Sequence, residues 1–268
     1  MARRTATAAV LLALIVPAVY FGGVMYFLLV GAFLLAAAWE YLKMFSAVDF
    51  RPSPPILLGG IFVILVSRAF APEVSTLPFA AAVLAAMTVH LVAFERGRDR
   101  AAVDFGVTVG GIAYLGWIGS YILDLRALPN GGWWVMLVFP IVWLADSGAY
   151  LIGVQYGRHK MLPRLSPHKS WEGYWAGVVG GTLCGVLFAY AYSHFGPLQI
   201  TLWQGAALGL ILSVLTTLGD VGESLFKRFA GFKDSGSFLP GHGGAFDRID
   251  SLMWAAVIGY YCIKFWLT

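Results

Sequence analysis

The strongest constraint on the fold is a series of apolar segments that recurs along the whole chain. Nine segments approach or exceed the roughly 20 residues with which a helix crosses a bilayer: 5–20, 22–44, 55–70, 77–94, 102–123, 133–156, 171–194, 200–218 and 249–267. Only 12% of the residues are charged, against about 25% in a typical soluble domain. We therefore predict an all-α polytopic membrane protein with about nine transmembrane helices, in which residues 1–268 form a single integral membrane domain.

The Lys and Arg residues lie mostly in alternate connections between these segments. Fifteen of the 18 lie in one set of connections, and only Arg68, Arg126 and Lys264 lie in the other set. Because Lys and Arg are enriched in cytoplasmic loops, the asymmetry predicts a cytoplasmic N-terminus and an external C-terminus in the cell (inner) membrane. The join at residues 21–23 is short, so a merged or re-entrant pair of first segments is an alternative.

A polar stretch, residues 219–251, separates the last two apolar segments. It contains five acids and four bases beside several glycines: Asp220, Glu223, Asp234, Asp247, Asp250, Lys227, Arg228, Lys233 and Arg248. Carboxylates bind hard divalent cations, whereas Lys, Arg and glycine-rich backbone bind phosphate groups. The stretch therefore predicts a polar cytoplasmic active-site region between the last two helices, with metal-assisted chemistry on a phosphorylated substrate.

Four polar residues at the start of this stretch have helical spacing. Asp220, Glu223, Ser224 and Lys227 would form one stripe if the preceding helix continues past residue 218. An ordinary amphipathic helix end would explain the stripe on its own. Its combination with the glycines and Asp247 favours a functional site.

The glycine-rich sequence that follows supplies a flexible backbone before Asp247. Gly243 and Gly244 can approach a ligand closely and expose amide groups to phosphate oxygens. His242 is predicted to contact a phosphate or to hold the loop by a hydrogen bond. Asp247 and Asp250 begin the last apolar segment, where acids also favour a helix start by capping. We predict that Asp247 binds a cation, and we include Asp250 as a further ligand.

Two other acids lie within or at the end of apolar segments. Asp146 lies well inside 133–156, where a charge costs about 2.5–3.5 kcal/mol on insertion, so a functional role is expected. A helix–helix hydrogen bond or a protonated acid is the alternative. Glu40 ends the second segment, and snorkelling to the interface explains it.

A second polar motif precedes the seventh apolar segment. It reads Ser166-Pro-x-Lys169-Ser170-x-Glu172-Gly173. Ser170 is a natural N-cap, and Glu172 suits the first turn of a helix. Lys169 beside a helix N-terminus also suits anion binding, and the two roles can coexist.

The fixed polar residues of the stretch form a long and distinctive pattern. It consists of Ser224-x-Phe226-Lys227-Arg228, Lys233-Asp234-x-Gly236, Leu239-Pro240-x-His242-Gly243-Gly244 and Asp247-Arg248-Ile249-Asp250. This pattern closely resembles the signature of the phosphatidate cytidylyltransferases, also called CDP-diacylglycerol synthases. Ala245 departs from it, because the family usually has a larger aliphatic residue there. The motif at 166–173 resembles the second motif of the same family.

The resemblance implies the transfer of a cytidylyl group from CTP to phosphatidate, which gives CDP-diacylglycerol and pyrophosphate in phospholipid biosynthesis, with the acyl chains in the lipid bilayer. We predict Mg²⁺, with a second cation left open, at Asp220, Asp247, Asp250 and Asp146. The predicted catalytic residues, which would hold phosphate groups, are Lys169, Ser170, Lys227, Arg228, Lys233 and Arg248. The predicted substrate-binding residues are Ser166, Ser224, His242, Gly243 and Gly244.

A membrane transporter or channel with a charged cytoplasmic gate is the alternative from another class, with Asp146 in an ion pathway. Against it, the acids and bases cluster on one side, and no interrupted helices occur in matching halves. A CDP-alcohol phosphotransferase is a second alternative, but its Asp-Gly-x-x-Ala-Arg pattern is absent. We expect no nucleic-acid partner, and a homodimer is left open.

Overall fold

The computed structural model describes residues 2–238 and 243–267, which are mostly helical. The first half contains α1 (Ala2–Phe21), α2 (Gly23–Ser46), α3 (Pro54–Phe70), η1 (Pro72–Val74), α4 (Thr76–Glu95), α5 (Ala101–Gly111), η2 (Ile112–Ile118) and α6 (Tyr121–Ala127). The second half contains α7 (Gly131–Tyr156), β1 (Lys160–Leu162), β2 (Ser166–Ser170), α8 (Trp171–Phe195), α9 (Leu202–Leu215), α10 (Thr217–Phe229), α11 (Phe246–Cys262) and η3 (Ile263–Leu267). Each predicted apolar segment overlaps at least one of these helices. The all-α prediction is confirmed except for the short hairpin of β1 and β2.

Six helical stretches in the described part of the chain are long and apolar enough to cross a membrane: Gly23–Ser46, Pro72–Glu95, Ala101–Ala127, Gly131–Tyr156, Trp171–Phe195 and Leu202–Phe229. The protein is therefore an integral membrane protein with several spans, and the count of nine stays a prediction. Ala9–Phe21 and Pro54–Phe70 are shorter apolar helices. α1 and α2 pack against each other as separate helices, with Gly22 between them at φ 65°. The merged alternative for the first two segments is therefore wrong.

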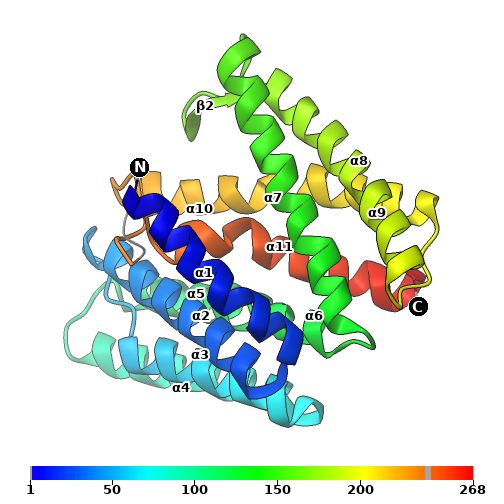
Figure 1. Ribbon diagram of the computed structural model, residues 1–268. Coiled ribbons are helices and arrows are strands. Elements are labelled where there is room, and N and C mark those ends of the chain that lie inside the picture. The colour runs from blue at the N-terminus through cyan, green and yellow to red at the C-terminus, as the bar shows by residue number, and fades with distance from the viewer. Residues whose placement is uncertain (1, 239–242, 268) are drawn as a thin grey trace. The chain divides into compact units, whose positions relative to one another are not determined.

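The chain forms two compact units, and each unit combines two parts of the sequence. The first unit contains Met1–Asp124 and Phe226–Ile249, and the second contains Leu125–Leu225 and Asp250–Thr268. In the first unit, α2, α3, α4 and α5 lie side by side, in blue to blue-green in Figure 1. Leu34 of α2, Leu57 of α3 and Ile112 of η2 are fully buried there, so the apolar faces of these helices contribute to its core.

In the second unit, glycines bring α8 close to α7 and α9 (Figure 1). They recur at every fourth residue of α8, at Gly173, Gly177, Gly181 and Gly185. A Cβ on Gly177 would lie 2.8 Å from the carbonyl oxygen of Ala145 in α7, and one on Gly185 would overlap the carbonyl oxygen of Gly205 in α9. Small residues at this spacing allow close packing of membrane helices, so α7, α8 and α9 form the packed body of this unit.

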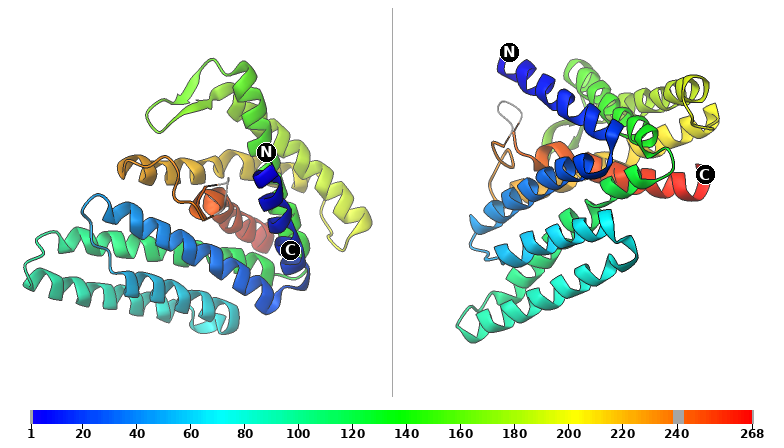
Figure 2. Two further views of the ribbon diagram at one scale, coloured as in Figure 1. Left: turned by 60° about the vertical axis from the view of Figure 1, so that its left-hand side comes forward. Right: turned by 60° about the horizontal axis from the view of Figure 1, so that its bottom comes forward.

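The connection between α7 and α8 contains the antiparallel hairpin of β1 and β2 (Figure 2). Lys160 pairs with Ser170, and Leu162 pairs with Ser166. β2 ends directly before Trp171, the first residue of α8. The hairpin therefore presents the second polar motif at the N-terminus of α8.

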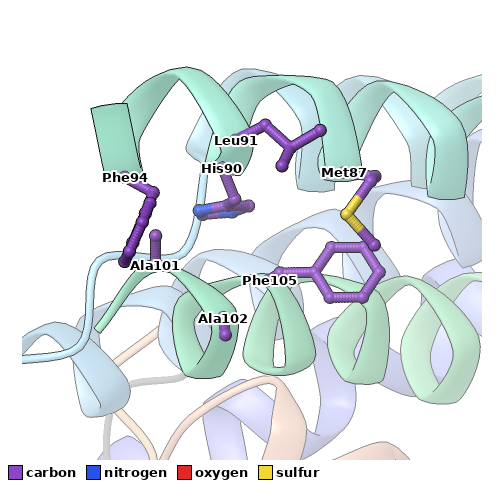
Figure 3. Close-up of a pocket in the computed structure, with 7 residues that line it drawn as sticks. All are labelled: Met87, His90, Leu91, Phe94, Ala101, Ala102 and Phe105. Carbon is purple, nitrogen blue, oxygen red and sulfur yellow. The ribbon is translucent and has the colours of Figure 1, made fainter. Parts of the chain in front are cut away.

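An apolar groove of about 150 Å³ lies between α4 and α5 in the first unit (Figure 3). It is lined by Met87, His90, Leu91, Phe94, Ala101, Ala102 and Phe105. His90 is only 4% exposed, and its Nε2 lies 2.9 Å from the hydroxyl of Thr108, so this polar atom bonds within the protein. None of the predicted site residues that the structure describes lines the groove, so we do not assign the chemistry to it.

Candidate active site

Three carboxylates of the second unit converge. Asp220 and Glu223 lie on α10 and Asp250 lies on α11, and one oxygen from each lies within 4.8 Å of the others. We call these three residues the carboxylate cluster. Glu223 is 1% exposed and Asp250 is 9% exposed, so the cluster lies largely inside the protein. Oxygen donors grouped in this way suit a hard divalent cation.

Helical spacing and a glycine explain this convergence. Asp220 and Glu223 are three residues apart on α10 and therefore share a face. Gly219 allows α11 to come close, because a Cβ at this position would lie 2.6 Å from the carbonyl oxygen of Asp250. The hydroxyl of Ser224 lies 3.5 Å from Oδ1 of Asp220. The polar residues therefore share a helix, as predicted, but this helix is α10, which begins at Thr217 after α9 has ended at Leu215, so it is not a continuation of the preceding helix.

Two predicted residues from other elements of the second unit approach Asp220. Nζ of Lys169, on β2, lies 2.7 Å from Oδ2 of Asp220. Asp146, on α7, interacts electrostatically with both Lys169 and Asp220. An intramembrane acid and a base from the second polar motif therefore accompany the carboxylate cluster.

The rest of the second polar motif anchors the hairpin to α8. The hydroxyl of Ser170 accepts a hydrogen bond from the N–H of Gly173 at 3.2 Å, so its prediction as an N-cap is confirmed. The carboxylate of Glu172 accepts the N–H groups of Arg158 and His159 at 3.2 Å. These bonds hold the start of α8, directly after Lys169, against the residues that precede β1.

In the first unit, the carboxylate of Asp247 bonds to polar groups of Lys227, Ser235 and Gly244. Its Oδ1 accepts from Nζ of Lys227 at 2.6 Å. Its Oδ2 accepts the N–H of Ser235 at 3.0 Å and that of Gly244 at 2.8 Å, and it lies 2.9 Å from the Ser235 hydroxyl. A cation at Asp247 would have to replace some of these donors. The amide of Gly244, a predicted substrate contact, donates to this carboxylate.

Glu40 shares the partner Ser235 with Asp247, and the interpretation that Glu40 snorkels to the interface is wrong. Its side chain lies on α2 and is 5% exposed. It accepts the N–H groups of Ala245 and Phe246, each at 3.0 Å, and lies 2.9 Å from the hydroxyl of Ser235. We call Glu40, Lys227, Ser235, Gly244 and Asp247 the loop cluster. The only sequence signal for Glu40 was an acid at the end of an apolar segment.

The other predicted residues lie on or near α10, α11 and β2. Arg228 donates to the carbonyl oxygen of Phe232 at 3.3 Å, Lys233 and Arg248 are exposed, Gly243 has φ 82°, and Ser166 lies in β2. His242 lies outside the described residues. α10 and α11 each carry residues of both clusters.

Comparison with known proteins extends these observations to the whole chain. The model of the cytidylyltransferase family matches residues 2–266. A phosphatidate cytidylyltransferase of Staphylococcus aureus (strain COL) is 32% identical over 251 residues, which cover 93% of this chain and 94% of the relative. The enzymes of that name from Staphylococcus saprophyticus and Staphylococcus epidermidis (strain ATCC 12228) are 35% and 34% identical, over 255 and 253 residues and the same shares of both chains. The similarity therefore includes the carboxylate cluster, the loop cluster and the second polar motif.

Proposed function

The chain belongs to the cytidylyltransferase family, and we propose that it transfers a cytidylyl group from CTP to phosphatidate, giving CDP-diacylglycerol and pyrophosphate. The observation that carries this conclusion is similarity to phosphatidate cytidylyltransferases over 93% of the chain. A transporter or channel has no comparable support. We retain residues 1–268 as a single catalytic domain, and a second copy of the chain as a predicted partner.

The reaction needs little covalent chemistry from the protein. A phosphate oxygen of phosphatidate forms a bond to the α-phosphorus of CTP. The bond from that phosphorus to the oxygen that bridges to the β-phosphate breaks, and pyrophosphate leaves with its electron pair. Because the attacking phosphate is already an anion, no Ser or His base is required. The protein contributes by positioning the two substrates and by neutralising their charge.

We assign the divalent cation to the carboxylate cluster, Asp220, Glu223 and Asp250. Its donors are carboxylate oxygens, which Mg²⁺ prefers, and they are grouped within 4.8 Å. A bound Mg²⁺ supplies positive charge to the phosphate oxygens. Lys169, 2.7 Å from Asp220, adds a positive charge beside the cluster, and Asp146 stays a predicted participant.

We assign the phosphate groups to basic residues of α10, α11 and the segment between them. The set is Lys227, Arg228, Lys233 and Arg248, with Lys169 and Ser170 from the second polar motif. Lys233 and Arg248 are exposed and therefore accessible to a nucleotide. Lys227 is held by Asp247 at 2.6 Å, which fixes the direction of its ammonium group. Ser166, Ser224, His242, Gly243 and Gly244 stay predicted substrate contacts.

Purified protein should release one pyrophosphate for each CDP-diacylglycerol, and only when CTP, phosphatidate and a divalent cation are all present. Diacylglycerol should not react, because it lacks the attacking phosphate. Labelled CTP followed by lipid extraction measures one product, and a coupled pyrophosphate assay measures the other. Release of orthophosphate, or reaction of diacylglycerol as fast as phosphatidate, would replace this function with a phosphatase or kinase activity.

We further propose nine spans in the cell (inner) membrane, with the N-terminus and the polar motifs in the cytoplasm and the C-terminus outside. Fifteen of the 18 basic residues lie in the connections assigned to the cytoplasm, as the enrichment of Lys and Arg in cytoplasmic loops requires. This orientation also exposes the phosphate-binding residues to the compartment that contains CTP.

Single cysteines at Asp99 and Ala127 should react with a membrane-impermeant maleimide from opposite sides of the membrane. Asp99 lies in the connection between α4 and α5, Ala127 ends α6, and both are exposed. The two native cysteines, Cys184 and Cys262, are replaced first. Labelling of intact cells and of inverted vesicles measures the sidedness, and reaction of both positions from one side would contradict the nine-span orientation.

A further inference from the structure

Glu40 makes contacts that an acid at the membrane interface does not require. Its Oε1 accepts the N–H of Ala245 and its Oε2 accepts the N–H of Phe246, each at 3.0 Å. Phe246 is the first residue of α11, and N–H groups at a helix start have no partner within the helix. A carboxylate there is also favoured by the helix dipole. Glu40 of α2 therefore fixes the point at which the chain enters α11.

Two glycines of the family signature leave space for this carboxylate. A Cβ on Gly236 would overlap Oε1 of Glu40, and a Cβ on Gly244 would overlap both its carboxylate oxygens and the hydroxyl of Ser235. A larger residue at either position would push the chain away from Glu40. Positions 236 and 244 therefore require glycine because Glu40 lies so close to them. This reason holds whether or not either residue contacts a phosphate.

Ser235 connects Glu40 to Asp247. Its hydroxyl lies 2.9 Å from Oε2 of Glu40 and 2.9 Å from Oδ2 of Asp247. A hydroxyl has one proton to donate, so it can donate to only one of the two carboxylates at a time. A change at Glu40 therefore alters the hydrogen bonding of Asp247, which in turn holds Lys227.

We propose that Glu40 is a positioning residue for the cytidylyl transfer. It holds residues 235–236 and 243–246 in the conformation that places Asp247 against Lys227, one of the bases assigned to phosphate. Glu40 acts through these residues and does not touch the substrates. The inference rests on the proposed function, because it concerns how that reaction is supported.

The central variant is Glu40→Gln, which keeps the shape of the side chain. Since both carboxylate oxygens accept an N–H group, the new NH₂ group would face a donor. Ser235→Ala removes the shared hydroxyl, whereas Ser235→Thr retains it. Lys43→Gln is the matched control, because it removes a charge from an exposed position on the same helix, α2.

We expect Glu40→Gln to lower kcat roughly 10- to 100-fold, the loss that follows removal of hydrogen bonds to a charged group, with a smaller change in KM for CTP. Amide exchange at residues 244–246, measured by mass spectrometry, should become faster, while that of α3–α5 stays unchanged.

Ser235→Thr should retain most of the activity that Ser235→Ala loses. The double variant Glu40→Gln/Ser235→Ala should be no slower than the slower single variant, because both residues belong to one network. Lys43→Gln should behave as the wild type.

Wild-type kcat together with wild-type amide exchange in Glu40→Gln would overturn the proposal. A lower Tm with normal kcat for the folded protein would also overturn it, because Glu40 would then only stabilise the start of α11. If Glu40→Gln does not insert into the membrane, the activities of Ser235→Ala and Ser235→Thr test the proposal. Equal activities of these two variants would reject the hydrogen-bond network of Glu40, Ser235 and Asp247. Failure of the wild type to form CDP-diacylglycerol would instead reject the proposed function, and amide exchange would still test the contact of Glu40 with the loop.

Discussion

Asp220→Asn is expected to lower kcat by roughly 10²- to 10³-fold. This is the usual effect of removing one group that stabilises charge in a transition state. Asn preserves the size of the side chain but removes the negative charge that favours Mg²⁺. The fold should persist, because the side chain of Asp220 is 40% exposed and lies outside the apolar core. Initial rates of CDP-diacylglycerol formation over a range of Mg²⁺ concentrations measure the effect.

Loss of the negative charge at either of the other two members of the carboxylate cluster should weaken the binding of the cation. Glu223→Gln and Asp250→Asn should each raise the Mg²⁺ concentration that gives half-maximal activity. Glu95→Gln is the matched control, since Glu95 is an exposed acid at the end of α4, and it should retain wild-type rates. Asp220→Asn with wild-type kcat and an unchanged Mg²⁺ requirement would remove Asp220 from the cation site. Poor expression with normal specific activity would make its role structural.

Those parts of the structure that depend on local sequence were predictable. Long apolar segments became helices, because a chain in a bilayer must satisfy its backbone hydrogen bonds internally. The spacing of Asp220 and Glu223 predicted one helical face, and α10 continues through both residues. The hairpin at 160–170 was not predicted, because strands of three and five residues are too short to show a clear alternating pattern.

The grouping of the acids depends on contacts between distant segments, which local sequence does not reveal. Asp247 and Asp250 lie three residues apart on α11, so their spacing does not distinguish them. The structure groups Asp250 with Asp220 and joins Asp247 to Lys227. Glu40 was missed because its backbone partners lie 205 and 206 positions later in the chain.

Asp247→Asn is expected to lower kcat by at least roughly 100-fold, because breaking a buried ion pair by removing one partner costs about 3–5 kcal/mol. The side chains of Lys227 and Asp247 are only 12% and 9% exposed. The NH₂ group of Asn would face either the ammonium of Lys227 or the N–H groups of Ser235 and Gly244. The segment before α11 would lose its arrangement, and rates at saturating CTP and phosphatidate measure the loss.

A magnesium titration of the same variant separates the two roles considered for Asp247, cation ligand and organiser of the loop. With both oxygens bonded within the loop cluster, we expect Asp247→Asn to keep the wild-type Mg²⁺ requirement, whereas Asp250→Asn raises it. Lys227→Met breaks the same ion pair from the other side, so it should reproduce the loss in kcat and also leave the Mg²⁺ requirement unchanged. The opposite result would be a rise in the Mg²⁺ requirement of Asp247→Asn as large as that of Asp250→Asn, with no rise in Lys227→Met. In that case the charge of Asp247 would act on the cation, and Asp247 would belong to the metal site.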